Sequence, residues 1–412
     1  MSLSTALSGL NAAETALQTI SNNLANMNTD GYKSQTSTFA DLFYQTYGNS
    51  GSGNPIQTGL GVQVTGTSQD FSNGAVASTG VSSNMALNGS GFFVVQNGSG
   101  AQTYTRNGDF TTNASGQLIT LGGQLVMGYP VVNGVVSANS ALQPINVGSG
   151  TSAPATPTAN FSLTTNLNAG TAMNGTFQSP INVYDSLGNS HVLAIGYTLT
   201  APNTWTYSVT IPSSDLQGGV GSSTQVATGT LNFNSSGQLV SPASPIAIAI
   251  GSLADGAANM NLNWQLTDGS GNSLLTQTAS ASSNNATTQD GFASGVLSSY
   301  SVLSDGTVDG TFSNGQTRAI GQVAVASFAN PEGLTLDGDN QYSATAASGA
   351  AVIGAAGTAG RGTIAGSSVE QSNVDMATQF SQLIVYQRAY EANAKAITAF
   401  DQMEQATIQM KS

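Results

Sequence analysis

The chain has 412 residues, of which only 7% are charged, and its formal net charge is −13. Ordinary soluble domains carry about 25% charged residues, so the surface of this protein is expected to be neutral and polar. The seven Lys and Arg form no basic cluster, which makes nucleic acid and membrane surfaces poor partners. The chain has no cysteine, which excludes disulfides, thiolate nucleophiles and zinc–thiolate sites.

The N-terminus lacks the features of a cleaved export signal. Its first basic residue is Lys33, whereas a secretory signal begins with a positive region. No apolar run approaches the ~20 residues that are needed to span a bilayer. We therefore expect no membrane insertion, and export would need a route without signal cleavage.

The first 27 residues carry the clearest repeat of the chain. Leucines recur every seven residues, and an apolar residue follows three positions after each, which is a full heptad pattern and predicts a long helix. The leucines are Leu3, Leu10, Leu17 and Leu24, and the second set is Ala6, Ala13, Ile20 and Met27.

An asparagine-rich segment follows this helix. It contains Asn22, Asn23, Asn26 and Asn28, and Gly31 is a candidate for a left-handed terminating position. The amides either fray the helix end or contact neighbouring helices, since each amide offers two donors and an acceptor. Asparagine inside the last heptads lowers helix propensity, so we favour contact with other helices.

The C-terminus repeats the helical pattern. Its apolar stripe predicts a second long helix, although Gln387, Asp401 and Glu404 interrupt it. The stripe consists of Met376, Phe380, Leu383, Tyr390, Ala394, Ile397 and Ile408. A single stripe on an isolated terminal helix stabilises it only marginally, because ordering the backbone costs about 1–2 kcal/mol per residue. The helices therefore need partners, which we expect to be each other and other copies of the chain.

The region from about 60 to 365 is typical of antiparallel β-structure. Trp205, Tyr207, Val209 and Ile211 alternate with polar residues, as do Leu262, Trp264 and Leu266. Turn dipeptides such as Asn107-Gly108 separate these runs. The motif "SGQL" recurs at 115–118 and 236–239, which suggests two related hairpins.

The fold class is expected to be mixed. Long N- and C-terminal helices would form a paired helical domain, with two or more mostly antiparallel β-rich domains inserted between them. Gly-, Ser- and Pro-rich stretches at 48–59 and 148–160 are expected to be connectors. The chain is expected to cross back from the outer β-domain to the first one near 282–291. The expected domains are 1–30 with 366–412 (inner helices), 31–70 (connector), 71–147 with 288–365 (first β-domain) and 148–287 (outer β-domain).

The sequence points to no enzyme. The one histidine, His191, has no carboxylate pair at a spacing typical of a triad or a metal site, so we expect a surface histidine at a strand edge. "GRGTIAG" (360–366) lacks the β-α-β context of a dinucleotide fingerprint. The segment from Asp337 resembles a calcium loop only weakly, because Tyr342 replaces its turn glycine. No catalytic, metal-binding or cofactor-binding residue is assigned.

Both ends of the chain resemble one known family. "SGLNAAETALQTISNNLANMNTDGYK" (8–33) and "SNVDMATQFSQLIVYQRAYEANAKAITAFDQM" (372–403) are similar to the terminal motifs of bacterial flagellar axial proteins of the rod and hook family. Within this family, "GLGVQV" (59–64), "TRNGDF" (105–110), "NVYDSLGNSH" (182–191) and "GQVAVASFANPEGL" (321–334) resemble the hook subunits.

The resemblance implies a structural role in the flagellar hook, outside the cell. Subunits would be exported by the flagellar apparatus and would form a curved tubular homopolymer that acts as a universal joint and transmits torque. Partners would be the rod protein, the hook–filament junction protein, the hook cap and the hook-length-control protein. Carried over by position, the assembly residues would include Asn22, Asn23, Asn26, Asn28, Gly31, Lys33, Asn373, Asp375, Gln387, Arg388 and Asn393.

The full set of expected polymer contacts adds the apolar positions Leu3, Leu10, Leu17, Ile20, Leu24, Phe380, Leu383, Tyr390 and Ile397.

Three other functions remain open. A distal rod protein is disfavoured by the segment 148–290, because a rod subunit resembles only the termini and the first β-domain. A secreted adhesin or an extracellular enzyme would not explain the paired terminal heptads.

Overall fold

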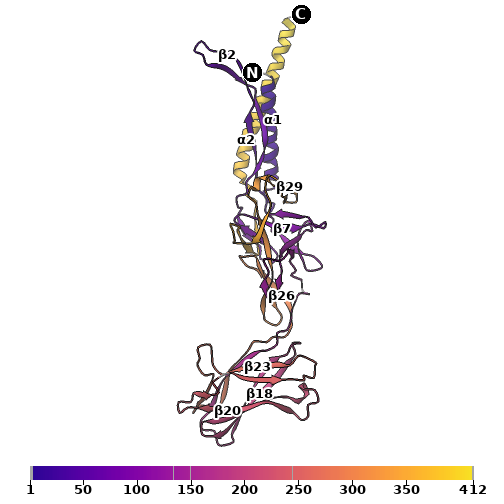
Figure 1. The fold of residues 1–412 in the computed structure, drawn as a ribbon. Coiled ribbons are helices and arrows are strands. Elements are labelled where there is room, and N and C mark those ends of the chain that lie inside the picture. Colours follow the sequence, from indigo (N-terminus) through magenta and orange to yellow (C-terminus); the bar gives the residue numbers. More distant parts are fainter. Residues whose placement is uncertain (1–2, 133, 149, 244, 411–412) are drawn as a thin grey trace. The chain divides into compact units, whose positions relative to one another are not determined.

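The computed structural model describes residues 3–410 apart from 133, 149 and 244. A helix lies at each end of the chain, α1 (Leu3–Ala25) and α2 (Met376–Met410), and β-strands fill the sequence between them (Figure 1). The expected mixed fold with terminal helices is confirmed at this level. The chain divides into unit 1 (Met1–Gly148, Ser299–Gly310 and Thr317–Ser412) and unit 2 (Ser149–Ser298 and Thr311–Gln316).

The two helices of unit 1 begin and end where local chemistry dictates. Helix α1 stops at Ala25, and Gly31 then turns the chain with a φ of +71°. Helix α2 starts at Met376, because Asp375 Oδ1 accepts a hydrogen bond from the Thr378 N–H at 2.7 Å. The segment before it, expected to be part of the C-terminal helical region from 366, instead holds strand β33 (Ser368–Glu370).

A pair of nested hairpins follows α1. Strand β1 (Gln35–Asp41) pairs with β4 (Val62–Gln69), and β2 (Tyr44–Asn49) pairs with β3 (Pro55–Gly59), all antiparallel. The stretch 48–59, expected to be a connector from its composition, is therefore largely paired backbone. Composition could not reveal these strands, because both β2 and β3 are exposed along their whole length and so show no alternation.

The rest of unit 1 is built on one large, mostly antiparallel sheet. Its main path runs β26-β27-β28-β11-β7-β8-β30-β29, with β9, β10, β14 and β31 attached at its sides. Two clusters of buried side chains flank it, one around Phe93 and Val325 and the other around Phe92 and Tyr342. The strands are β7 (Phe92–Gln96), β8 (Gln102–Thr105), β9 (Phe110–Thr112), β10 (Leu118–Thr120), β11 (Leu125–Tyr129), β14 (Gln143–Pro144), β26 (Gly295–Val302), β27 (Thr307–Phe312), β28 (Thr317–Ser327), β29 (Thr335–Gly338), β30 (Gln341–Ser343) and β31 (Val352–Ala355).

Three short pairs complete unit 1. Two of them join segments that are far apart in the chain, so the first and last parts of the β-region pair with each other, whereas the third is a local hairpin. The pairs are β5 (Val76–Ser78) with β33, β6 (Met85–Asn88) with β32 (Thr363–Gly366), and β12 (Val131–Val132) with β13 (Val135–Val136). A 3₁₀ turn, η2, covers Pro331–Gly333.

Unit 2 is a sandwich of two five-stranded sheets around one apolar core. One sheet has the order β17-β18-β19-β20-β21, and the other has β22-β23-β16-β24 with β25 also on β16. Trp205, Trp264 and Tyr197 lie fully buried between them. The alternation noted in the sequence thus marks inward-facing positions. The strands of the sandwich are β16 (Asn160–Asn168), β17 (Thr176–Tyr184), β18 (Ser190–Ala201), β19 (Thr204–Pro212), β20 (Ser223–Phe233), β21 (Leu239–Ser241), β22 (Ile246–Ile250), β23 (Met260–Gln265), β24 (Leu275–Thr278) and β25 (Ser283–Gln289). Strand β15 (Ser152–Ala153) belongs to neither of the two sheets and pairs with β26.

Two expectations for unit 2 need correction. The residues near 282–291, expected to contain a return crossing, are mainly strand β25, which pairs with β16 inside the sandwich. His191, expected at the surface, is only 6% exposed and lies among Asp185, Asp215 and Asp255. Two of these aspartates are 24 and 64 positions away from it in the sequence, so local spacing could not show the cluster.

The repeated "SGQL" motif forms the same hairpin twice. Asn113 Oδ1 accepts hydrogen bonds from the N–H groups of Ser115 and Gln117, between β9 and β10 in unit 1. Asn234 Oδ1 does the same for Ser236 and Gln238, between β20 and β21 in unit 2. The glycine of each copy has a φ near +76°, at +77° for Gly116 and +75° for Gly237. The prediction of two related hairpins is confirmed.

Candidate polymer interface

One asparagine of the amide-rich segment joins the two helices of unit 1. Asn23 is 1% exposed, and its Nδ2 donates to Gln379 Oε1 of α2 at 3.1 Å and to the Gln35 carbonyl at 2.7 Å. Its Oδ1 accepts from the Tyr32 hydroxyl at 3.1 Å and from the Gln35 N–H at 2.9 Å. This side chain therefore uses its amide fully to hold α1, α2 and the start of β1 together.

The neighbouring asparagines serve the helix end. Asn26 Nδ2 donates to the Asn22 carbonyl at 3.0 Å and to Asn22 Oδ1 at 3.1 Å, so these two amides close the last turn of α1. Asn22 and Asn28 are exposed. The two interpretations of the segment thus apply to different residues: Asn23 contacts another helix within the subunit, and Asn22 with Asn26 terminates α1.

The heptad of α1 is divided between two environments. Ala6, Ala13 and Ile20 are buried, at 4% exposure each. The leucines are not: Leu3 is 48% exposed, and Leu10, Leu17 and Leu24 are half-buried. Small side chains allow close approach of the neighbouring elements, and at Gly9 an added Cβ would lie 2.9 Å from the Asn393 side chain of α2. The leucines are left partly open to solvent.

Helix α2 exposes most of its apolar residues. Figure 1 shows it alongside α1 and continuing beyond it toward the C-terminus. Leu383 and Ile397 are half-buried, and the ring of Tyr386 lies near that of Phe39 of β1, with centroids 6.3 Å apart and planes tilted by 42°. The exposed members, between 37% and 83% exposed, are Met376, Phe380, Ile384, Val385, Tyr390, Met403, Ile408 and Met410. The helix thus has more apolar surface than its own subunit covers.

Lys33 lies inside the subunit, in a buried ion network. Its Nζ is 2.7 Å from Glu370 Oε1 and donates to the Ser72 carbonyl at 2.6 Å. Arg106 Nη1 is 3.3 Å from Glu370 Oε2, and its Nη2 donates to the Gly89 carbonyl. Burial lowers the pKa of Lys33 despite the neighbouring Glu370. The network fastens the chain after α1 to the chain before α2.

Two further positions support this junction. Asn373 Oδ1 accepts from the Ser34 N–H at 2.8 Å, and its Nδ2 donates to the Asp70 carbonyl at 2.8 Å. At Gly31 an added Cβ would lie 2.5 Å from the Asn107 backbone nitrogen, so both the positive φ and the close packing require glycine. Asp375 caps α2, and the Thr378 N–H bond to it lowers its pKa.

The other predicted positions lie along α2. Gln387 and Arg388 are exposed, whereas Asn393 is half-buried beside Gly9. Sequence reasoning missed Gln379, Glu370 and Arg106, which complete the contacts of Asn23 and Lys33. The sequence offered one signal for the Lys33–Arg106 contacts: basic residues are scarce, and Arg106 and Lys33 are two of only seven.

Models of four protein families match successive parts of the chain. They are the flagella basal body rod protein family (residues 3–33), the flagellar hook protein FlgE/F/G D1 domain (86–165), the flagellar basal body protein FlaE D2 domain (146–292) and the flagellar basal body rod FlgEFG protein C-terminal family (365–410). These matches define the class of protein as a structural component of the flagellar axis.

Relatives narrow the class to one family. The chain is 36% identical to the flagellar hook protein FlgE of Escherichia coli, over 100% of both chains, and 32% identical to that of Borreliella burgdorferi, over 100% of this chain and 99% of the relative. A crystal structure of Helicobacter pylori FlgE2 is similar at 13% identity with a TM-score of 0.49, covering 70% of this chain and 98% of that one. The chain belongs to the flagellar hook protein FlgE family.

Family membership makes the chain a structural subunit of the bacterial flagellar hook and not an enzyme. Among the described residues, no helix is long and apolar enough to cross a membrane. The rod-type terminal segments, 3–33 and 365–410, contain all twenty positions expected to form polymer contacts.

Proposed function

We propose that the subunit polymerises through its terminal helices into a curved tube that acts as a universal joint between the motor and the filament. The observation that carries this proposal is the apolar surface of α2 that unit 1 leaves exposed, including Phe380, Ile384 and Tyr390. Burying one such side chain contributes about 1.5–3 kcal/mol. Several of them on one helix, repeated in every subunit, would supply a strong axial contact.

The proposed interface separates two sets of residues. Asn23, Lys33, Gly31 and Asn373 shape the subunit from within, since their contacts are intramolecular. The exposed positions would meet other subunits. These are Leu3, Asn22, Asn28, Phe380, Gln387, Arg388 and Tyr390, with the half-buried Leu10, Leu17, Leu24, Leu383 and Ile397 beside them.

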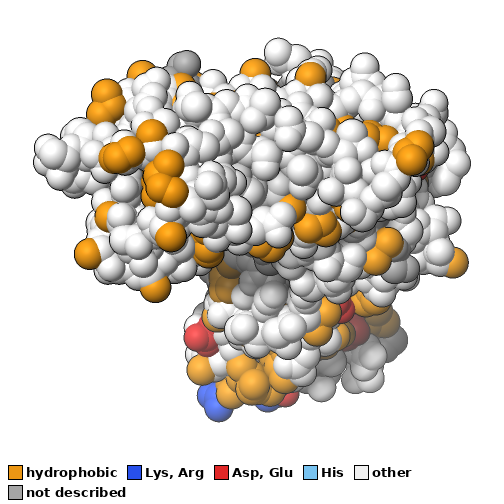
Figure 2. All heavy atoms as spheres, turned by 90° about the horizontal axis from the view of Figure 1, so that it is seen from below, with side chains coloured by type: hydrophobic (Ala, Val, Ile, Leu, Met, Phe, Trp, Pro, Cys, Tyr) orange, Lys and Arg blue, Asp and Glu red, His pale blue; other side chains and the backbone are white. Residues whose placement is uncertain are grey.

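The proposed domain plan follows the same logic. The terminal helices would line the tube as a paired inner domain, the strands from 31 to 70 would connect outward, and the β-domains would form the middle and outer shells. The face of unit 2 that Figure 2 shows is mostly polar and uncharged, with hydrophobic side chains spread over it. Such a surface suits weak outer contacts that change as the tube bends.

The proposed partners are flagellar components. Within the assembly these would be the rod protein at the proximal end and the hook–filament junction protein at the distal end. During growth the hook cap, the length-control protein and the export apparatus would take part. The neutral surface and the net charge of −13 give no binding role to nucleic acid.

Electron microscopy of hooks sheared from cells that produce only this subunit tests the proposal. The expected result is short curved tubes of uniform diameter. Straight rods, or motile cells in which this chain is absent from the tubes, would contradict it. A distal rod role would give straight rods, so the same images separate the two candidates.

A further inference from the structure

Unit 2 has an unusual distribution of charge. Its sequence contains no lysine, arginine or glutamate, five aspartates and one histidine, His191. Three of the five aspartates, Asp185, Asp215 and Asp255, surround that histidine. Asp185 is fully buried. Burial of a carboxylate is costly unless a positive charge or strong hydrogen bonds compensate it, and this unit has no basic side chain other than the imidazole.

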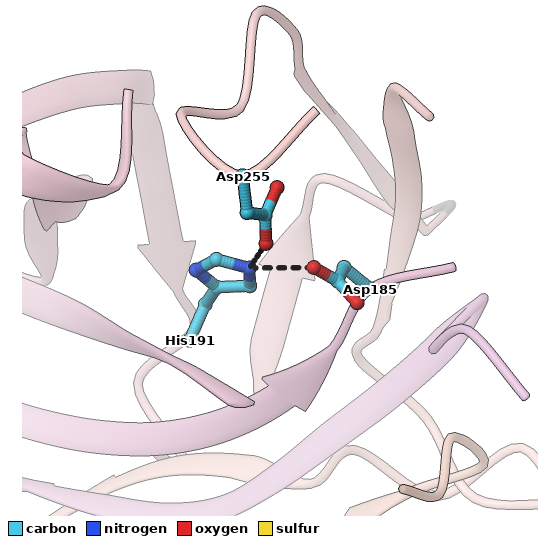
Figure 3. Close-up of side chains that lie close together, drawn as sticks. All are labelled: Asp185, His191 and Asp255. Carbon is cyan, nitrogen blue, oxygen red and sulfur yellow. Dashed lines mark hydrogen bonds and ion pairs between the residues drawn. The ribbon is translucent and has the colours of Figure 1, made fainter. Parts of the chain in front are cut away.

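The side chains converge on one ring nitrogen. His191 Nε2 is 3.2 Å from Asp185 Oδ2 and 3.8 Å from Asp255 Oδ2, and both carboxylates point at it from different segments (Figure 3). The three atoms lie within 4.8 Å of one another. Asn189 Nδ2 is 2.9 Å from the same Asp255 oxygen. One nitrogen and two oxygens thus surround a common point.

The backbone holds each carboxylate by its other oxygen. Asp185 Oδ1 accepts from the N–H groups of Leu187 and Asn189, at 2.8 and 2.9 Å. Asp255 Oδ1 accepts from the Ala257 N–H at 3.0 Å. Both aspartates are therefore oriented by tight turns, and each directs its Oδ2 to the common point.

The second ring nitrogen of His191 is held from outside the group. Nδ1 is 2.9 Å from Asp215 Oδ2, in the short 3₁₀ turn η1 (Ser213–Asp215). If Nδ1 carries the hydrogen, Nε2 presents a lone pair toward Asp185 and Asp255. A carboxylate that accepts from the distal nitrogen of a ligating imidazole is the usual outer arrangement of protein metal sites.

We propose that Asp185 Oδ2, His191 Nε2 and Asp255 Oδ2 bind one divalent transition-metal ion, with Asp215 orienting the imidazole. An imidazole with two carboxylates suits Zn²⁺ and its neighbours better than Mg²⁺ or Ca²⁺, which prefer oxygen ligands alone. The side chain of Asp255 is 26% exposed and leaves access for the ion from solvent. The ion joins the β17–β18 turn, the start of β18 and the loop between β22 and β23, and so stiffens unit 2.

A proton is the natural competitor of the metal. Burial lowers the pKa of His191, but hydrogen bonds to Asp215 and Asp185 outweigh it and raise this pKa above the usual value. A proton on Nε2 would hold the same carboxylates without any metal. Metal binding must displace that proton, so it is favoured at higher pH.

The test uses the full-length subunit without a histidine tag, treated with EDTA, dialysed and titrated with ZnCl₂ at pH 8. Calorimetry should show one Zn²⁺ per chain, and Zn²⁺ should raise the melting temperature of unit 2. Asp255→Asn should weaken binding at least about tenfold, and it should still fold because an amide oxygen can keep the Ala257 bond. Asp268→Asn, the same charge change on an exposed aspartate of this unit, should bind normally.

Two results would overturn the proposal. One is the lack of saturable one-to-one Zn²⁺ binding, together with a unit 2 melting temperature that Zn²⁺ does not change. The other is equal affinity in the native chain and in Asp255→Asn, which would place the bound ion elsewhere.

Discussion

Lys33 and Glu370 are 337 positions apart in the chain, yet their side chains form an ion pair at 2.7 Å with neither exposed to solvent. The pair joins the residues that follow α1 to those that precede α2. Glu370 also accepts from the Gly74 N–H at 2.9 Å and meets Arg106, so one carboxylate connects four segments of unit 1. The ends of the chain are fixed to the β-region at this point.

Replacing Glu370 by glutamine should destabilise unit 1 strongly. The change leaves Lys33 and Arg106 buried without a counter-charge, and breaking a buried ion pair in this way costs about 3–5 kcal/mol. In urea, hydrogen exchange of unit 1 amides should show an earlier transition for unit 1, whereas the fluorescence of Trp205 and Trp264 should show an unchanged transition for unit 2. Glu332→Gln, at an exposed glutamate of unit 1, is the matched control and should change stability by less than about 0.5 kcal/mol. Equal effects of the two variants would refute a structural role for the network.

Asn23 and Asn22 offer a direct comparison within one segment. Asn23→Ala removes four hydrogen bonds at a buried position and should cost about 1–3 kcal/mol, because Gln35, Tyr32 and Gln379 each lose a hydrogen bond to this side chain. Asn22→Ala, at an exposed position, should change stability by less than about 0.5 kcal/mol. Hydrogen exchange of the amides of residues 20–36 measures the stability change in both variants. Faster exchange in Asn22→Ala than in Asn23→Ala would reverse the assignment.

The sequence predicted those elements of the fold whose residues follow a local hydrophobic period. Heptads located α1 and α2, and alternation located the inward-facing residues of β19 and β23, such as Trp205 and Trp264. The hairpin of β2 and β3 was not predicted, because strands that are exposed on both faces have no hydrophobic period. An alternation of apolar and polar residues indicates a strand with one buried face, and neither β2 nor β3 has a buried face within the subunit.

The candidate site was predictable only as a set of positions. Position-by-position resemblance named Asn23 and Lys33, but their partners Gln379 and Glu370 lie more than 330 residues away. The same limit hid the surroundings of His191. Such contacts form only because the folded β-region brings the C-terminal segment back beside the N-terminal one, and the spacing of neighbouring residues does not show this.

Asp290 should make the stability of unit 2 depend on pH in the acidic range. Partial burial raises its pKa, but hydrogen bonds from the backbone and side chain of Asn160 and the N–H of Ala159 outweigh this and lower it. A lowered pKa stabilises the fold above the unfolded value near 3.9, and this contribution is lost as the pH falls through the folded value.

Asp290→Asn should therefore melt at a lower temperature than the native chain at pH 6, and the difference should shrink below about pH 4. Thermal unfolding of unit 2 between pH 2.5 and 7 measures it. A difference that stays constant down to pH 2.5 would show that the carboxylate charge contributes nothing.

Phe380→Asp should block assembly without affecting the free subunit. Phe380 is 48% exposed on α2, so a charge there meets water in the monomer but would be buried without a partner in a helix contact between subunits, at a cost of several kcal/mol. Val220→Asp, at an 89% exposed position of unit 2, is the control and should assemble normally. Sedimentation measures the polymer yield, and calorimetry the melting temperature. Normal polymer yield from Phe380→Asp would remove this residue from the interface.

In the proposed hook, other subunits cover the apolar residues of the terminal helices that remain exposed in one subunit. An electron cryomicroscopy map of the tube would show these contacts. We expect Phe380, Ile384 and Tyr390 of α2 to pack against α1 or α2 of neighbouring copies on the inner wall. A map in which these side chains face solvent, while subunits touch only through their β-domains, would contradict it.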